Sequence, residues 1–323
     1  MIWSGKLSDR KLKRINMNKL KSYKGDIILV LAALVYGSGL VAQKDGMNNL
    51  GPFTFTAIRF IMGGIVLIPV AMIVRKHKSP EQKAAEMPVK KMLKGCIATG
   101  FVLTAMVVAQ QYGLPYTTVG KAGFISGLYV ILTPIAGVLF LKRKISPRIW
   151  VAAIISVVGF YFLSLSGGID NINRGDVLML ITAIAGTIYL YTIEYFAGKA
   201  DTCIFTSLQF LATGAICLPF ALILETCTLH DIYLAMWPLL YAGLGICGVG
   251  YTFQMLGQKY VESERATILL SLETLFSLLS GMILLNEVLT FREYIGCGLM
   301  FAAVMLAETN SKTKKIDEEI YKL

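Results

Sequence analysis

Ten apolar runs, each close to the length of a membrane-spanning helix, constrain this chain more than any other feature. A helix needs about 20 consecutive apolar residues to cross a hydrocarbon core that is ~30 Å thick. The runs cover residues 26–43, 53–74, 95–113, 121–141, 149–166, 175–196, 204–224, 235–257, 265–285 and 293–308. Only 16% of the 323 residues are charged, whereas a soluble protein usually has about 25%. We therefore predict an all-α integral membrane protein with ten transmembrane helices.

The distribution of basic residues predicts how these helices are oriented. Of the 31 lysine and arginine residues, 26 lie in the two tails and in the loops that follow runs 2, 4, 6 and 8, whereas four lie in the other loops. Cytoplasmic loops of membrane proteins carry such an excess of lysine and arginine. We expect a multi-pass protein of the cytoplasmic membrane with both termini in the cytoplasm. The net charge of +11 is then explained by topology, and no nucleic-acid partner is expected.

The two halves of the chain repeat each other. A shift of 150 residues superimposes the segment FTFTAIRFIMGGIVLIPVAMI, which begins at Phe53, on TCIFTSLQFLATGAICLPFALI, which begins at Thr202. A shift of 144 relates the later spans and pairs Tyr129 with position 273. Each half holds five spans, and because five is odd the second half enters the membrane from the opposite face. Inverted repeats of this kind are common in secondary transporters, whose substrate site lies between the halves near the bilayer midplane.

These observations predict four segments along the chain. They are a basic cytoplasmic N-terminal tail (1–24), a first five-helix repeat (25–166), a second, inverted five-helix repeat (175–308) and a cytoplasmic C-terminal tail (309–323). The first span follows a basic segment, as a secretory signal does, but nine further spans favour a retained helix. Met17 is an alternative start, which would shorten the basic tail.

Motifs for the common chemistries are absent from the sequence. It contains neither the GxxxxGK[ST] loop that binds nucleotide phosphates nor the HExxH pattern of zinc proteases, and no GxSxG of serine hydrolases. The six cysteines are scattered without a CxxC pair, and most of them lie in apolar runs, where a free cysteine behaves as a small hydrophobic residue. We therefore expect no cofactor, no metal site and no enzymatic activity.

The chain resembles a known family, the drug/metabolite transporter superfamily, and within it the EamA-like ten-helix permeases. The resemblance lies in VYGSGLVAQK and PFTFTAIRF of the first half, in GKAGFISGLYVILTPIAGVLFLKRKIS of the fourth span and in RATILLSLETLFSLLSGMILLNEVLT of the ninth. It covers nearly all of residues 25–308. Three positions depart from the pattern: Tyr36 stands where tryptophan is usual, Arg143 replaces a glutamate, and Thr274 replaces a proline.

Two ionisable residues lie inside predicted spans. Glu273 is ~12 Å from the cytoplasmic end of span 9, and Arg59 is ~10 Å from the outer end of span 2, at 1.5 Å per residue. Such residues are costly in hydrocarbon and usually face a bundle interior, a partner or a wet cavity. We expect Glu273 to line a central site, where it binds a substrate amine or exchanges a proton. The alternatives are a protonated Glu273 that hydrogen-bonds Tyr129 or a helix backbone, and an Arg59 that extends outward to the interface.

Other polar residues share helical faces with these two. We take the residues that line a substrate pathway to be Glu273, Tyr129, Arg59, Gln110, Gln254, Tyr251, Ser277 and Tyr191. A structural alternative holds for each, because hydroxyl groups often hydrogen-bond within their own helix and tyrosines often lie at the membrane interface.

The expected function is secondary transport of small metabolites, such as amino acids or related neutral or zwitterionic compounds. Export is the direction that the resemblance implies, by alternating access at a midplane site. The expected partners are a small-molecule substrate, the lipid bilayer and, as a candidate coupling ion, the proton. The alternatives are an uptake permease of the same substrate class and a non-transporting receptor or scaffold.

Overall fold

The computed structural model describes residues 23–39, 42–43, 45–81, 86–116, 119–164, 173–285 and 290–321. These residues form helices and loops and contain no strand. Six of the described helical segments are long and apolar enough to cross a membrane, and Pro147–Leu163 is a shorter apolar helix. The described part of each predicted span lies mainly in one helix or in consecutive helices. The protein is therefore the all-α, multi-pass membrane protein that its sequence predicts.

The first half of the chain contains the first five spans. They are a helix over residues 23–39, α2 (Pro52–Lys76), α4 (Val89–Gly113) with the short turn η1 (Leu114–Tyr116), α5 (Val119–Gly127) followed by α6 (Tyr129–Leu139), and α7 (Pro147–Ser164). The N-terminal tail, residues 1–22, lies outside the described part.

The second half contains the other five spans. They are α8 (Arg174–Phe196), α9 (Thr202–Leu224), then α11 (Met236–Leu240), η2 (Tyr241–Tyr251) and α12 (Thr252–Gln258) in succession, α13 (Ser263–Leu270) followed by α14 (Leu272–Leu285), and α15 (Phe291–Tyr321). The short helix α10 (Leu229–Leu234) precedes the eighth span. The tenth helix continues beyond its predicted end at residue 308, to Tyr321.

Side chains at the helix ends explain where several helices begin. Asn173 and Asp176 form a reciprocal capping box at the start of α8, and the Asp201 side chain accepts a hydrogen bond from the Ile204 amide at the start of α9. The start of α2 has no cap of its own; the Glu225 carboxylate accepts hydrogen bonds from the amides of Phe53 and Thr54. Glu225 ends α9, so this contact joins the two halves of the chain.

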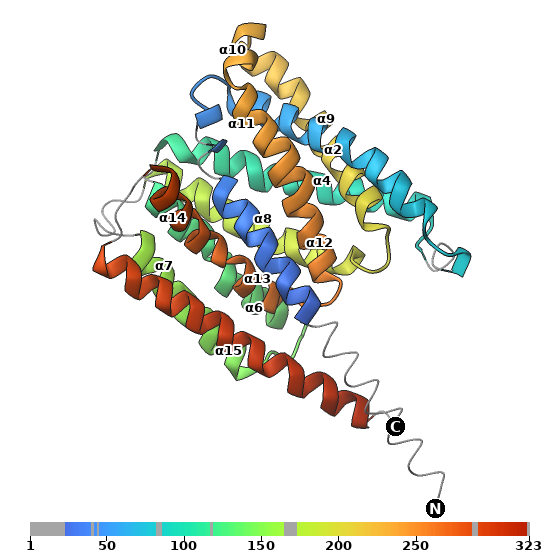
Figure 1. The fold of residues 1–323 in the computed structure, drawn as a ribbon, viewed down its shortest axis with the longest axis vertical. Helices are drawn as coiled ribbons and strands as arrows, with labels where there is room; N and C mark the ends of the chain where they lie inside the picture. The colour runs from blue at the N-terminus through green and yellow to red at the C-terminus, as the bar shows by residue number, and fades with distance from the viewer. Residues whose placement is uncertain are drawn as a thin grey trace, which may run out of the picture.

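Equivalent helices of the two halves pack against each other. In Figure 1, α2 lies beside α9 at one side of the molecule, and α7 lies against α15 at the opposite side. Between these pairs, α4 packs on α8, and α13 lies among α6, α7 and α15. The Phe60 and Phe210 rings, which the repeat relates, meet edge to face with centroids 5.1 Å apart. The two-repeat arrangement thus places the central helices of both halves around the middle of the bundle.

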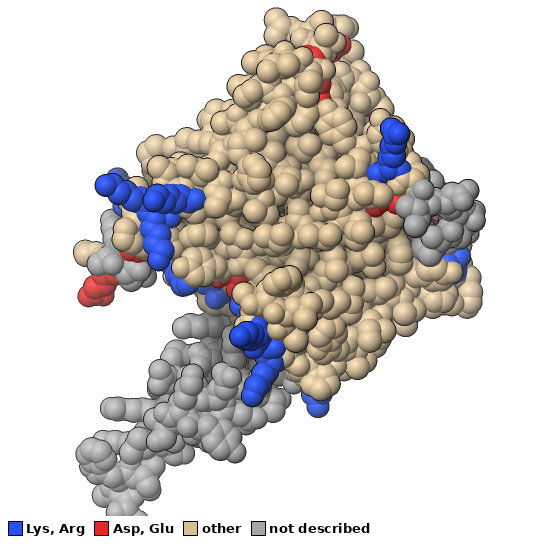
Figure 2. All heavy atoms as spheres, turned by 180° about the vertical axis from the view of Figure 1, so that it is seen from behind, with Lys and Arg blue, Asp and Glu red and all other residues tan. Residues whose placement is uncertain are grey.

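The outer surface matches a hydrocarbon environment. Exposed side chains on the long helices include Phe101, Leu222 and Ile223, the last of which is 80% exposed. Uncharged residues cover most of the face in Figure 2, and Lys and Arg gather in a few clusters toward its edges. Large exposed apolar areas of this kind mark an interaction surface, which here is lipid.

Candidate functional site

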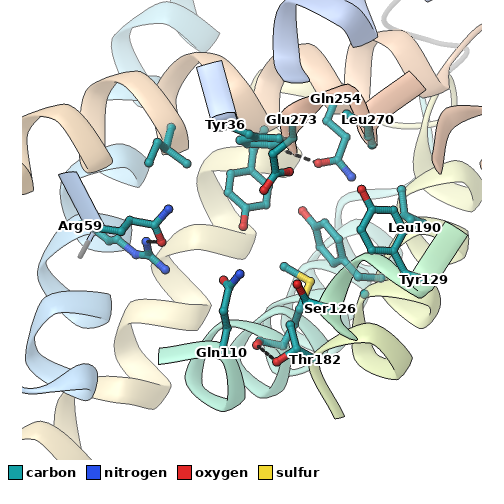
Figure 3. Close-up of a pocket in the computed structure, with 16 residues that line it drawn as sticks. Tyr36, Arg59, Gln110, Ser126, Tyr129, Thr182, Leu190, Gln254, Leu270 and Glu273 are labelled. Carbon is teal, nitrogen blue, oxygen red and sulfur yellow. Dashed lines mark hydrogen bonds between the residues drawn. The ribbon is translucent and has the colours of Figure 1, made fainter. Parts of the chain in front are cut away.

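A cavity of about 120 Å³ lies between the two repeats. Residues from both halves line it: Tyr36, Gln43, Arg59, Met106, Gln110, Ser126, Tyr129, Thr182, Gly186, Tyr189, Leu190, Ile246, Tyr251, Gln254, Leu270 and Glu273. In Figure 3, Arg59 lies on one side of this space, Tyr129 on the other, and the Glu273 carboxylate points into it between them. The cavity is smaller than the ~300–1,000 Å³ typical of sites for drug-sized ligands.

Breaks in two helices position Tyr129 and Glu273. The fourth span is interrupted at Leu128, between α5 and α6, and the ninth at Ser271, between α13 and α14. Each break contains a short-range bond: the Leu128 amide donates to the Ile125 carbonyl, and the Thr274 amide donates to the Ser271 carbonyl. Discontinuous helices at corresponding positions of two repeats often mark a transporter's binding site. Here the break at Leu128 directly precedes Tyr129, and the break at Ser271 lies two residues before Glu273, so each is next to a residue of the cavity wall.

Arg59 forms a buried polar cluster at one end of the cavity. Its side chain is 2% exposed, and its Nη1 donates a 2.6 Å hydrogen bond to Gln43 Oε1, which also accepts a 3.1 Å bond from Gln111 Nε2. The guanidinium lies over the rings of Phe55 and Phe60, at 5.4 and 5.0 Å from their centroids. These contacts hold the cation in the bundle instead of letting it extend toward the membrane surface.

Tyrosines form the wall between Arg59 and the ninth span. The Tyr36 hydroxyl donates a 2.6 Å hydrogen bond to Gln254 Oε1, and its ring meets the Tyr251 ring at 5.1 Å. Tyr251 contacts Tyr189 in turn, with centroids 6.1 Å apart, and the Tyr189 hydroxyl accepts a bond from Gln209 Nε2. Amphipathic rings of this kind present both an apolar face and a polar hydroxyl to a bound solute.

The Glu273 carboxylate differs from the other polar groups of the wall. Among the described residues it has neither an ion-pair nor a hydrogen-bond partner, and Arg59 bonds Gln43 instead. Tyr129, the residue equivalent to Glu273 in the first repeat, lines the same cavity without bonding it. The carboxylate is therefore available to a cationic group or a proton that enters the cavity.

Sequence comparisons give the family of the protein. The sequence model of the EamA-like transporter family matches the chain twice, over residues 23–165 and 173–309. The chain belongs to the EamA-like transporter family. It is 30% identical over 293 residues to an uncharacterized transporter of Archaeoglobus fulgidus, covering 89% of this chain and 86% of the relative. It is also 21% identical to the uncharacterized transporter YoaV of Bacillus subtilis, covering 89% of this chain and 98% of the relative.

A solved structure shares the fold. A crystal structure that is 18% identical in sequence superimposes with a TM-score of 0.71 and covers 88% of this chain and 96% of the other. At this identity the likeness concerns the fold alone. This EamA-like transporter is therefore a two-repeat helical membrane protein, and its relatives are named as transporters rather than enzymes.

Six of the eight site residues expected from the sequence line the cavity of this transporter. They are Glu273, Tyr129, Arg59, Gln110, Gln254 and Tyr251. Ser277 is not among the lining residues; its backbone faces Gly37, where a Cβ would lie 2.8 Å from the Ser277 nitrogen. Tyr191 lies elsewhere, with its hydroxyl 2.6 Å from the Thr133 carbonyl oxygen and 3.0 Å from Glu264 Oε1.

The sequence interpretation missed several residues of the wall. On the sixth span, Thr182, Gly186 and Tyr189 line the cavity at spacings of four and three residues, whereas Tyr191 is on another face. On the first span, Tyr36 and Gln43 are seven residues apart and share one face. The spacing of polar residues on each helix could have indicated these faces. On the sixth span, however, the face that carries Tyr191 is also polar, so the spacing did not show which of the two faces lines the cavity.

A cluster of charged residues joins the two repeats at one end of the bundle. Arg143 Nη1 lies 3.0 Å from Glu194 Oε1 and 3.2 Å from Glu264 Oε1, and the Ser263 hydroxyl donates to Glu194 Oε2 at 2.7 Å. Partial burial lowers the pKa of Arg143, but the bond to Glu194 and the two carboxylate charges outweigh this and raise the pKa above its ordinary value. The cluster is about 6–9 Å from the cavity along the helices, since Glu194 follows Leu190 by four residues and Glu264 precedes Leu270 by six.

Three further ion pairs lie toward the same end of the bundle. Arg265 pairs with Asp26 at 2.6 Å, with both side chains buried, and Lys78 pairs with Glu86 at 2.7 Å and with Asp201. Burial lowers the pKa of Lys78, but its bonds to Asp201 and Glu86 raise the pKa above its ordinary value, so the amine stays charged at neutral pH. The cavity is thus separated from this end by packed helices and ion pairs.

Proposed function

We propose that this EamA-like transporter is a secondary exporter of small neutral or zwitterionic metabolites, such as amino acids, and that the substrate binds in the cavity between the repeats. The observation that carries the proposal is the Glu273 carboxylate, which has no partner among the described residues and faces a tyrosine-lined cavity with Arg59 at the opposite side. A solute with an amine and a carboxylate would find a counter-charge for each. Arg59 would first exchange its bond to Gln43 for the substrate.

The size and composition of the cavity support this substrate class. Its volume of about 120 Å³ suits a small solute, and its wall offers one cation, one carboxylate and several amide and hydroxyl groups. A highly charged substrate would leave its excess charge unpaired in a site surrounded by hydrocarbon, which is costly. A compound with no net charge avoids this cost.

The proposed mechanism is alternating access with Glu273 as the titrating group. A carboxyl group in a desolvated site can take up a proton when no cation is present and release it when a substrate amine binds. Proton entry from one side and substrate release to the other would then be linked at one residue. We further propose that both termini are cytoplasmic, which the 26 basic residues of the tails and even-numbered loops support.

A thermal-shift screen followed by flux measurements tests the proposal. Purified full-length protein in neutral detergent would be heated with amino acids and related metabolites one at a time, since a ligand that binds the folded state raises its stability. Compounds that raise the melting temperature would then be measured for release from preloaded proteoliposomes. Arg59→Gln should abolish the shift for carboxylate-bearing compounds, whereas Arg148→Gln, on the exposed surface of α7, should preserve it.

The outcomes distinguish an exporter from an uptake permease and from a non-transporting receptor or scaffold. Release of a stabilising solute by the parent, and loss of its release in Arg59→Gln, supports the proposal. Binding without flux in either direction would favour a receptor or scaffold, and accumulation against a gradient into the cytoplasmic-side compartment would favour uptake. Either result contradicts export.

A further inference from the structure

A second, larger cavity lies on the outside of the bundle, between α6 and α8. Its volume is about 630 Å³, and it shares no lining residue with the central cavity. Its walls are Leu132, Ile135, Ala136, Phe140 and Leu141 on one side and Ile184, Thr187, Ile188, Tyr191, Thr192 and Tyr195 on the other. Ile184, Ile188 and Phe140 are 47%, 51% and 81% exposed, so the groove is open to the surroundings of the helices. In a membrane those surroundings are lipid chains.

The groove has the length of one leaflet. Its lining runs from Ile184 to Tyr195 along α8, which is eleven steps of 1.5 Å or about 16 Å. This is close to half of the ~30 Å hydrocarbon core. The lining continues past the end of α6 to Leu141, so the groove reaches the membrane surface at one end.

Two cations lie at this end, each against a tyrosine of the groove. The Lys199 ammonium is 3.7 Å from the centroid of the Tyr195 ring, and the Arg143 guanidinium is 5.1 Å from that of Tyr191. A residue with left-handed backbone conformation precedes each of these cations. Gly198, with φ of 82°, precedes Lys199, and Lys142, with φ of 51°, precedes Arg143. The left-handed conformation of these residues reverses the chain at the helix end, and the Arg143 amide donates back to the Gly137 carbonyl at 2.9 Å.

The three cations at this end of the groove, Arg143, Lys142 and Lys199, outnumber the two carboxylates beside them. Glu194 and Glu264 pair with Arg143, but within the described residues Lys199 and the exposed Lys142 have no carboxylate partner. Two ammonium groups at the membrane surface, next to an apolar groove one leaflet deep, are complementary to a single class of molecule. That molecule has an anionic head group and a long apolar chain.

We propose that the groove between α6 and α8 binds an anionic phospholipid, with an acyl chain along Ala136 and Ile188 and the phosphate near Lys142 and Lys199. The acyl chain fills the groove that opens outward where α6 and α8 pack against each other. The head group lies beside Arg143 and Tyr191, which belong to the ion-pair cluster that joins the two repeats. The bound lipid thus stabilises that end of the bundle.

Native mass spectrometry of the full-length protein tests this site. The protein, delipidated in neutral detergent, would be titrated with phosphatidylglycerol or phosphatidylcholine carrying identical acyl chains. The parent should retain phosphatidylglycerol about tenfold more tightly than phosphatidylcholine. Lys142→Gln with Lys199→Gln should remove most of this preference, at about threefold per lysine, because each lysine near an anionic head group contributes electrostatic attraction. The matched pair Lys90→Gln with Lys94→Gln, on exposed positions at the start of α4, should keep it.

A substitution that fills the groove separates chain binding from surface charge. Ala136→Trp should reduce retention of both lipids, while Leu222→Trp, on the exposed surface of α9, should not. Melting curves without lipid would confirm that both variants fold, and Ile188→Trp replaces Ala136→Trp if the latter does not. Equal retention of the two lipids by the parent would overturn the proposal. So would a full preference in the lysine pair, unchanged binding in the filled variant, or a dimer of the chain that forms in place of lipid binding.

Discussion

Gly64 of α2 and Gly214 of α9 make reciprocal contacts across the interface between the two repeats. A Cβ built on Gly64 would lie 2.9 Å from the Leu211 side chain, and one built on Gly214 would meet the Ile61 side chain. Because Leu211 follows Ile61 by 150 residues, as Gly214 follows Gly64, one packing arrangement occurs twice about a two-fold axis. The repeat in the sequence is therefore also a repeat of contacts in the structure.

This close contact predicts that a branched side chain at Gly64 will separate α2 from α9. Gly64→Val should lower the free energy of unfolding by about 1–3 kcal/mol, the usual cost of overpacking. Gly298→Ala is the matched control, since nothing lies within 4 Å of its Cβ position and alanine favours a helix. Unfolding in mixed detergent micelles measures both variants. Equal stability of Gly64→Val and the parent would contradict this packing.

The charged cluster at one end of the bundle gives a second prediction. Arg143→Gln would leave Glu194 and Glu264 facing each other without the guanidinium between them. Because the Arg143 side chain is 35% exposed, we expect a moderate loss of about 1–3 kcal/mol in unfolding free energy. Adding Glu194→Gln should restore part of it by removing the repulsion. Arg148→Gln serves as the control, and a loss of the same size there would refute a specific role for Arg143.

The left-handed backbone of Lys142 gives a third prediction. A non-glycine residue in this region carries strain of about 1–2 kcal/mol. Lys142→Gly relieves the strain but makes the unfolded chain more flexible, so a net gain of about 0.5–1 kcal/mol is expected in lipid-free neutral detergent. Lys144→Gly, two residues further on, should lower stability instead. The prediction fails if both changes have the same sign.

Much of the fold could be predicted because the bilayer determines both the length of the apolar spans and the loops in which basic residues gather. The length of each apolar run and the repeat at fixed offsets predicted the spans, and the described part of each span lies mainly in helices. The π-helix of η2, from Tyr241 to Tyr251, could not be predicted, because its glycines are equally compatible with an α-helix. The break at Ser271 lacked a signal too, since Thr274 stands where a proline would have marked it.

The site was less predictable for a different physical reason. On a helix of a soluble protein, the face toward water is polar and the buried face is apolar, so the sequence distinguishes them. Here the faces toward lipid and toward other helices are both mostly apolar. The sixth span shows the consequence: its Tyr191 face and its Tyr189 face both carry polar residues, and of these two tyrosines only Tyr189 lines the cavity. Glu273 was easier to find, because an embedded carboxylate is rare.

Native Cys227 provides a fourth prediction, about the orientation in the membrane. It is the one cysteine classed as exposed among the described residues, and it lies between α9 and α10, in a loop expected to be extracellular. A membrane-impermeant maleimide should label intact cells through Cys227, and Cys227→Ser should abolish the label. In that background, Lys90→Cys at the start of α4 should react only after permeabilisation. The reverse pattern would contradict cytoplasmic termini.

The rate of this labelling should depend on pH. Burial, followed by the carboxylates of Asp231 and Glu225, raises the pKa of Cys227. The reactive species is the thiolate, so the thiol is less reactive than an ordinary cysteine at neutral pH. Asp231→Asn should speed labelling at pH 7, and the rate in the parent should keep rising above pH 8.5. An unchanged rate in Asp231→Asn would mean that the carboxylate does not act on the thiol.

We propose that the Glu273 carboxylate acts on substrate or proton in the cavity between the repeats. The most direct test of this claim is flux of a stabilising metabolite through proteoliposomes at several pH values, for the parent, Glu273→Gln and the control Glu262→Gln. Glu262 is exposed at the start of α13, outside the cavity, so that variant should transport like the parent. The amide of Glu273→Gln keeps the shape of the side chain but cannot titrate. We predict a loss of at least about tenfold in flux, equivalent to ~1.4 kcal/mol, together with loss of its pH dependence. Normal flux with the parent's pH profile in folded Glu273→Gln would contradict the claim and make the carboxylate structural.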